Sequence, residues 1–200
     1  MRIADIGTGT GILLTDLAAK LPKSVQLDEV PEHLIGAYDL VSVRHFAFVL
    51  QEHELQSAVK NLFRLLKPGG YLQWIDVDVS SQRIEKARPE INGEPQERIM
   101  NLFRGNDTRL SSAWVPSLSS RFSGAGLINV EVDQRNTPHY IGQQLFESGF
   151  LAVEALTRNN HLDDDKAREI EDIFRDSARV TRQGSYAGLT RYTVIGQKGL

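Results

Sequence analysis

A glycine-rich turn between an apolar strand and an amphipathic helix is the feature that most constrains the fold of this chain. The turn reads DIGTGTG, from Asp5 to Gly11. A short apolar strand at residues 2–6 precedes it, and it leads into GILLTDLAAKL, whose apolar residues recur at helical spacing. Glycines in such a turn allow a tight bend and bring backbone N–H groups close to a ligand at the helix N-terminus. The turn therefore predicts a strand, a binding loop and a helix.

The spacing of the glycines excludes two common nucleotide-binding motifs. A dinucleotide fingerprint needs a glycine at position 12, where this chain has Ile12. A phosphate-binding P-loop needs Gly-Lys-Ser/Thr, which the turn lacks. The alternative is a strand-to-helix turn that binds nothing, and three glycines after an acidic strand end count against it.

Strands and helices alternate along the rest of the chain. We expect strands at residues 38–43, 71–79, 128–133 and 190–196. We expect helices at residues 52–66, 97–103, 116–122, 143–156 and 164–180, the last with Asp163 as its N-cap. The sequence KPGG at 67–70 should end the first of these helices, and residues 81–112 are otherwise charged and irregular. This alternation predicts an α/β fold with a mainly parallel sheet.

Length and composition indicate one soluble domain and exclude several kinds of binding site. The 200 residues suit one domain, and the net charge of -3 supplies no field for nucleic acid. The absence of cysteine excludes disulfides, zinc–thiolate sites and thiol nucleophiles. No apolar run approaches the roughly 18–20 residues that span a bilayer. We expect a soluble cytoplasmic protein, with the nucleus left open, that binds neither nucleic acid nor membrane.

Three segments carry a resemblance to a known family. IADIGTGTGILLTDLA, YDLVSVRHF and LFRLLKPGGYLQWIDVD follow one another in the order found in class I S-adenosylmethionine-dependent methyltransferases, specifically the fungal group associated with secondary metabolism. The resemblance covers most of the chain and is weaker through the C-terminal helices. It implies a Rossmann-like sheet of strand order 3-2-1-4-5-7-6 flanked by helices, with helical segments 81–126 and 138–185 inserted over the acceptor side of a single domain, 1–200.

The resemblance also implies a set of site residues. The glycine loop of the family contacts the cofactor, and residues 43–46 would lie beside the sulfonium, so the cofactor-binding residues would be Asp5, Gly7, Thr8, Gly9, Gly11 and Arg44. His45 is the candidate general base for an acceptor hydroxyl, and a histidine satisfied by its loop neighbours is an equal alternative. Asp76 and Asp78 would end their strand, either facing the acceptor or solvated. Trp74 is expected in the core.

The other histidines, at positions 33, 53, 139 and 161, show no ligand spacing, so no metal site is expected. The residues VRHF at 43–46 also replace the Asp/Asn-Pro-Pro-Tyr signature of many amino-directed methyltransferases. That replacement disfavours an exocyclic amine of nucleic acid or of protein glutamine as the acceptor, and leaves a hydroxyl, acid or nitrogen of a secondary metabolite open.

The chain departs from the family pattern between its first helix and the strand at 38–43. Only residues 22–37 stand where two strands and two helices are expected, and one βαβ crossover already takes about 10–12 residues. The sheet should therefore lack one or two edge strands. Asp28 would substitute for the ribose-binding acid that normally lies about 20 residues beyond the turn, or it is a solvated loop carboxylate.

Two functions remain open at this stage. The first is methyl transfer from S-adenosylmethionine to a small-molecule acceptor. The alternative is a catalytically inactive protein of the same fold that acts as a binding or regulatory partner. Without the missing strands, the first strand should become or approach a sheet edge, which invites homo- or hetero-oligomers. A third function, cofactor-independent cyclisation or isomerisation, has no positive support in the sequence.

Overall fold

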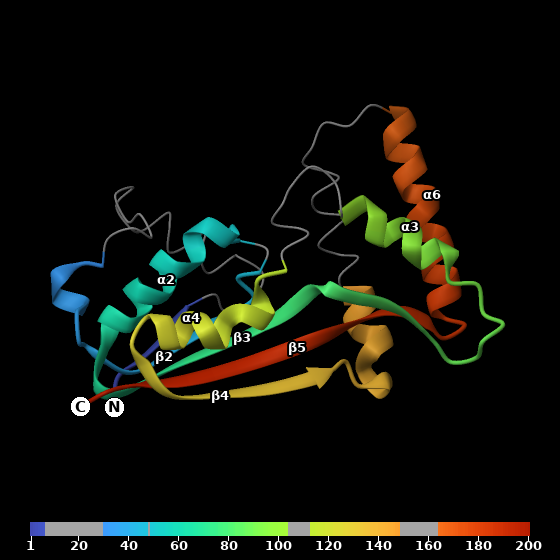
Figure 1. Ribbon diagram of the computed structural model, residues 1–200. Coiled ribbons are helices and arrows are strands. Elements are labelled where there is room, and N and C mark those ends of the chain that lie inside the picture. The colour runs from blue at the N-terminus through green and yellow to red at the C-terminus, as the bar shows by residue number, and fades with distance from the viewer. Residues whose placement is uncertain (7–29, 48, 104–112, 149–163) are drawn as a thin grey trace. The chain divides into compact units, whose positions relative to one another are not determined.

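The computed structural model describes residues 1–6, 30–47, 49–103, 113–148 and 164–200 (Figure 1). The elements with defined bounds are β1 (Ile3–Ile6), η1 (Glu32–Leu34), β2 (Tyr38–Arg44), α2 (Glu52–Leu65), β3 (Leu66–Lys86), α3 (Glu94–Phe103), η3 (Val115–Ser117), α4 (Leu118–Gly124), β4 (Leu127–Asn136), α6 (Asp164–Thr181) and β5 (Ser185–Lys198). Residues 139–148 are also helical. In this part of the chain, no helix has the length and apolar character needed to cross a membrane.

The five strands form one sheet in the order β1-β2-β3-β5-β4. β1 pairs in parallel with β2, and β2 pairs in parallel with β3. This order corresponds to strands 1-4-5-7-6 of the expected sheet, with the two strands beyond the first absent from the described residues. The predicted α/β fold is confirmed, and β1 lies at the edge of the sheet that the described residues form.

The chain divides into two compact units. The first contains residues 1–80, 112–135 and 191–200, and the second contains residues 81–111 and 136–190. β3 and β5 contribute residues to both units because each of these strands runs across a boundary. Each unit is described below by itself.

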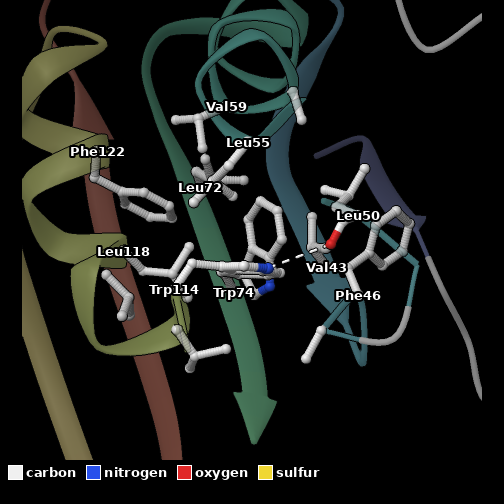
Figure 2. Packing of buried hydrophobic residues seen from close by; sticks show 14 of the residues in the cluster. Val43, Phe46, Leu50, Leu55, Val59, Leu72, Trp74, Trp114, Leu118 and Phe122 are labelled. Atoms are coloured by element: carbon white, nitrogen blue, oxygen red, sulfur yellow. Dashed lines mark hydrogen bonds between the residues drawn. The ribbon is translucent and has the colours of Figure 1, made fainter. Parts of the chain in front are cut away.

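The first unit has an apolar core between the sheet and helices α2 and α4, which lie over one of its faces (Figure 1). Figure 2 shows the side chains that meet there from the sheet, the two helices and the loop after β2. The largest that are fully enclosed are Trp74, Phe122, Leu55, Leu66, Leu72 and Leu118. Trp74 therefore lies in the core, as predicted.

Helix α2 begins and ends where its local sequence dictates. The Glu54 carboxylate accepts a hydrogen bond from the Gln51 N–H at 2.8 Å and so satisfies one of the free donors at the helix start. The backbone is already extended at Leu66, ahead of Pro68, a residue that disfavours helix before it. Gly70 follows, and a Cβ there would come within 3.1 and 3.2 Å of the Tyr38 and Asp39 carbonyl oxygens of β2. Because glycine has no Cβ, β3 can lie close to β2 at this position.

The second unit encloses a polar cluster, defined here as Gln96, Ser177, Thr181 and Ser185, all fully buried. The Gln96 side-chain amide donates to the Thr181 hydroxyl at 2.8 Å and to the Ser185 carbonyl at 2.5 Å. Its amide oxygen accepts a hydrogen bond from the Ser177 hydroxyl. This cluster links α3 to α6 and to the start of β5.

Several predicted elements are confirmed and several boundaries are wrong. β1, β2, α2, α3, α4, β4 and α6 lie where the sequence places them, within a few residues. β3 begins at residue 66 and continues to 86, so the prediction of an irregular segment from residue 81 is wrong. β5 likewise begins five residues before the predicted strand at 190–196. The predicted helix after the glycine turn, the Asp163 N-cap and residues 149–156 of another predicted helix lie outside the described residues.

Candidate active site

An ion pair joins the carboxyl ends of β1 and β2. Asp5 stands in register with Ser42 of β2, two residues before Arg44. The Arg44 Nη2 atom donates to the Asp5 Oδ2 atom at 2.7 Å, and the two side chains are 43% and 37% exposed. Both residues were predicted to bind the cofactor, but their pairing was not predicted. Parallel strands bring their carboxyl ends to the same edge of a sheet, which explains the meeting.

Both side chains of the pair are partly exposed, so a polar ligand can reach them. Arg44 Nε is buried and has no hydrogen-bond partner within the described part of the chain. A partly exposed ion pair contributes little to stability, about 0–1 kcal/mol, because water screens both charges. Asp5 and Arg44 can therefore rearrange around a polar ligand at low cost to the fold.

His45 adopts an unusual backbone conformation directly after the pair. Its φ is 59°, in the left-handed region that residues other than glycine rarely occupy. Its N–H donates to the Ile75 carbonyl of β3 at 3.1 Å, and its side chain is exposed. Such strain costs on the order of 1–3 kcal/mol and persists only where neighbouring contacts enforce it. The surroundings of His45 must therefore fix this loop.

Asp76 supplies the main contacts that fix the loop. Its Oδ2 atom accepts hydrogen bonds from the N–H groups of Phe46 at 2.8 Å and Ala47 at 3.0 Å. The same atom accepts from Trp74 Nε1 at 3.0 Å, and Oδ1 accepts from the Val77 N–H at 2.9 Å. All four donors are N–H groups, and an ionised carboxylate can accept a hydrogen bond from each of them but donates none.

Burial raises the pKa of the Asp76 carboxyl, and the hydrogen bonds from Trp74, Val77 and Phe46 oppose that rise. The prediction that Asp76 faces an acceptor or solvent is wrong, because its side chain is fully buried. The prediction that it ends its strand is also wrong, since β3 continues for ten residues beyond it. The alternation along β3 was the signal for this burial, because Asp76 shares a face with Leu72 and Trp74.

Asp78 is also inside β3 rather than at its end. Its side chain is 7% exposed, and its Oδ1 atom accepts a hydrogen bond from the Ser80 N–H at 3.0 Å. Burial and the charge of Asp78 together raise the pKa of the Tyr192 hydroxyl. Asp78 is thus one of the enclosed polar groups of the first unit, not a solvated strand end.

Aromatic packing holds the other side of the loop after β2. The Phe46 and Trp74 rings meet edge to face with centroids 6.0 Å apart, and Trp74 meets Trp114 in the same way at 5.8 Å. Trp114 Nε1 donates to the Leu50 carbonyl at 3.3 Å, the dashed line in Figure 2. The core of the first unit therefore extends up to the loop that carries His45.

The remaining predicted site residues cannot be placed. Five of the predicted cofactor-binding residues lie outside the described residues: Gly7, Thr8, Gly9, Gly11 and Asp28. Four of them follow the last residue of β1, Ile6, directly in the sequence. Of the predicted set, the structure brings together Asp5 and Arg44, with His45 next to Arg44 in the chain.

Comparison with known proteins supports the resemblance in sequence and in fold. Methyltransferase grgD of a Penicillium species is 36% identical over 114 residues, which cover 40% of this chain and 40% of that protein. The chain thus spans about 40% of the length of this curated relative. No protein-family model matches it.

The solved structures agree on the fold. Phosphoethanolamine N-methyltransferase 2 of Haemonchus contortus, in complex with phosphomonomethylethanolamine and S-adenosylhomocysteine, superposes with a TM-score of 0.51 at 11% identity. The match covers 100% of this chain and 49% of that one. The chain has the Rossmann-like fold of the S-adenosylmethionine-dependent methyltransferases. The [4+2]-cyclase SpnF superposes with a TM-score of 0.50 at 17% identity, over 100% of this chain and 74% of that one. The methyltransferase fold thus also occurs in a cyclase, and the reaction must be argued from the site.

Proposed function

We propose that the chain binds S-adenosylmethionine at the carboxyl ends of β1 and β2 and transfers the methyl group to a small molecule. The observation that carries the proposal is the Asp5–Arg44 pair, because it marks the carboxyl end of β1, which the glycine-rich sequence follows directly. In open α/β sheets, ligands bind outside the carboxyl ends of the strands. The 36% identity to a fungal methyltransferase supports the same reaction and suggests an acceptor from secondary metabolism.

In this proposal S-adenosylmethionine supplies a methyl group that its sulfonium has already activated. The chain contributes binding, orientation and proton removal. Asp5 and Arg44 would hold polar groups of the cofactor, together with Gly7, Thr8, Gly9, Gly11 and Asp28. A neutral His45 imidazole would take the proton of an acceptor hydroxyl. Asp76 would act as a positioning residue, because its hydrogen bonds hold the backbone directly after His45.

Isothermal titration with S-adenosylhomocysteine tests this proposal. We expect micromolar binding, about -8 kcal/mol, by the wild-type chain. Gly9→Val should abolish it, because a β-branched side chain resists the turn and fills space needed by the ligand. Gly199→Val is the matched control, since nothing lies within 4 Å of a Cβ at that position. A folded wild-type chain that does not bind, or a Gly9→Val variant that binds normally, would overturn the proposal.

The free edge of β1 is the proposed interface for oligomers. β1 pairs with β2 alone among the described strands, so one of its edges offers unpaired backbone groups there. Light scattering coupled to size-exclusion chromatography measures the mass of the assembly. The Arg2 carbonyl accepts a hydrogen bond from the Leu40 N–H of β2, so the N–H of the next residue, Ile3, points to the free edge. Replacing Ile3 by proline removes that N–H and should lower the mass of any oligomer, whereas a monomeric wild-type chain would contradict the interface.

A further inference from the structure

The face of the sheet turned away from α2 and α4 carries a hollow. Leu72, Trp74 and Asp76 point into the core of the first unit, so Ile75, between them along β3, points to the opposite face. A cavity of about 270 Å³ lies over Ile75 and is lined by residues of β3, β4 and β5: Ile75, Asp133, Arg135, Arg191 and Thr193. All of these residues belong to the first unit.

The charges around this hollow do not cancel. Arg135 forms an ion pair with Asp133: its Nε atom lies 2.8 Å from Asp133 Oδ2 and donates to Asp133 Oδ1 at 3.0 Å. Arg191 is exposed, and its guanidinium forms no hydrogen bond or ion pair with any described residue. Two guanidinium groups and one carboxylate leave a net charge of +1 on the lining.

We propose that this hollow binds the carboxylate of a small organic ligand. The planar, forked guanidinium of Arg191 matches a carboxylate bidentately, and the Thr193 hydroxyl can donate another hydrogen bond. Ile75 offers an apolar surface for the body of the ligand. A carboxylate carries the one negative charge that neutralises the lining, whereas a phosphate group carries about -1.5 to -2 at neutral pH. The site does not depend on the proposed methyl transfer.

Titration calorimetry at constant ionic strength tests the site with three probes. Benzoate has the carboxylate and an apolar body, benzyl alcohol has the body without the charge, and inorganic phosphate has charge without the body. We expect millimolar binding of benzoate and at least tenfold weaker binding of the other two. Stronger binding of phosphate than of benzoate would overturn the assignment to a carboxylate, and the absence of benzoate binding would overturn the site.

Four variants locate the binding. Arg191→Gln should weaken benzoate binding at least fivefold, and Asp133→Asn should strengthen it two- to fivefold because it removes the opposing charge. Arg88→Gln, at an exposed arginine of the second unit, should change nothing. Arg44→Gln distinguishes the hollow from the Asp5–Arg44 pair, since Arg44 lies in register with Ile75. If Arg44→Gln abolishes the binding while Arg191→Gln leaves it intact, the anion binds at the strand-end pair and the proposal is wrong.

Discussion

The two units bury different kinds of side chain. The interior of the first is mainly a continuous apolar cluster that runs from the sheet through α2 and α4 to the loop after β2, with the buried carboxylates of Asp76 and Asp78 in β3 as its polar groups. The second also buries apolar side chains, but between α3 and α6 it encloses the amide of Gln96 and three hydroxyl-bearing residues. Apolar packing is non-directional, whereas a buried amide must find partners at set positions. The first unit should therefore depend on volume and the second on hydrogen-bond geometry.

The largest effect should come from a cavity in the first unit. Leu72→Ala removes a fully buried side chain and should cost about 2–5 kcal/mol of unfolding free energy. Tyr71→Ala is the matched control one residue away on the opposite face, where the side chain is 44% exposed, and should cost less than about 1 kcal/mol. Urea unfolding followed by tryptophan fluorescence measures this, because both tryptophans, Trp74 and Trp114, belong to the first unit. Equal costs for the two variants would contradict the placement of the core.

A smaller loss is expected from the polar cluster of the second unit. Gln96→Leu conserves approximate volume but leaves the Ser177 hydroxyl and the Ser185 carbonyl without this partner, at a cost of about 1–3 kcal/mol. Adding Ser177→Ala removes one orphaned group and should restore part of the loss. Unfolding followed by far-ultraviolet circular dichroism reports the helices. A Gln96→Leu variant as stable as wild type would contradict the claim that the second unit depends on these hydrogen bonds.

The smallest effect is a pH dependence confined to the first unit. A hydrogen bond from the Arg2 N–H and another from the Lys67 ammonium lower the pKa of the Asp39 carboxyl below 3.8. Because the folded state favours the ionised carboxylate, Asp39 stabilises the folded state fully above about pH 3.8. This stabilisation is lost as the pH falls through the lower pKa that the carboxyl has in the folded state. Asp39→Asn should therefore lower the urea midpoint at about pH 6, and the difference from wild type should shrink at about pH 2. A difference that does not change with pH would contradict the role of this charge.

The same contrast explains what the sequence could predict. Helix α2 and strands β1 and β2 follow from apolar periodicity, because their buried or partly buried apolar residues pack against an apolar core. The sequence does not predict the extension of β3, because residues 81–86, SQRIEK, are mostly polar and charged, and such a composition is typical of a loop. Tertiary pairing, not local propensity, makes this segment a strand.

The candidate site shows the same limit. The residue types at the ends of β1 and β2 indicated a binding site, and family resemblance assigned Asp5 and Arg44 to it. Their pairing depends on the strand register, which only the folded sheet shows. The burial of Asp76 was not predicted because a carboxylate is expected in water unless N–H donors surround it, and two of its four donors, the Phe46 and Ala47 N–H groups, reach it only through tertiary folding.

Hydrogen–deuterium exchange with and without saturating S-adenosylhomocysteine tests the central claim most directly, namely that the carboxyl ends of β1 and β2 form the cofactor site. The account predicts slower exchange in peptides covering residues 1–11 and 43–50, with no change across β4. Unchanged exchange at both strand ends, or slowing confined to the second unit, would contradict it.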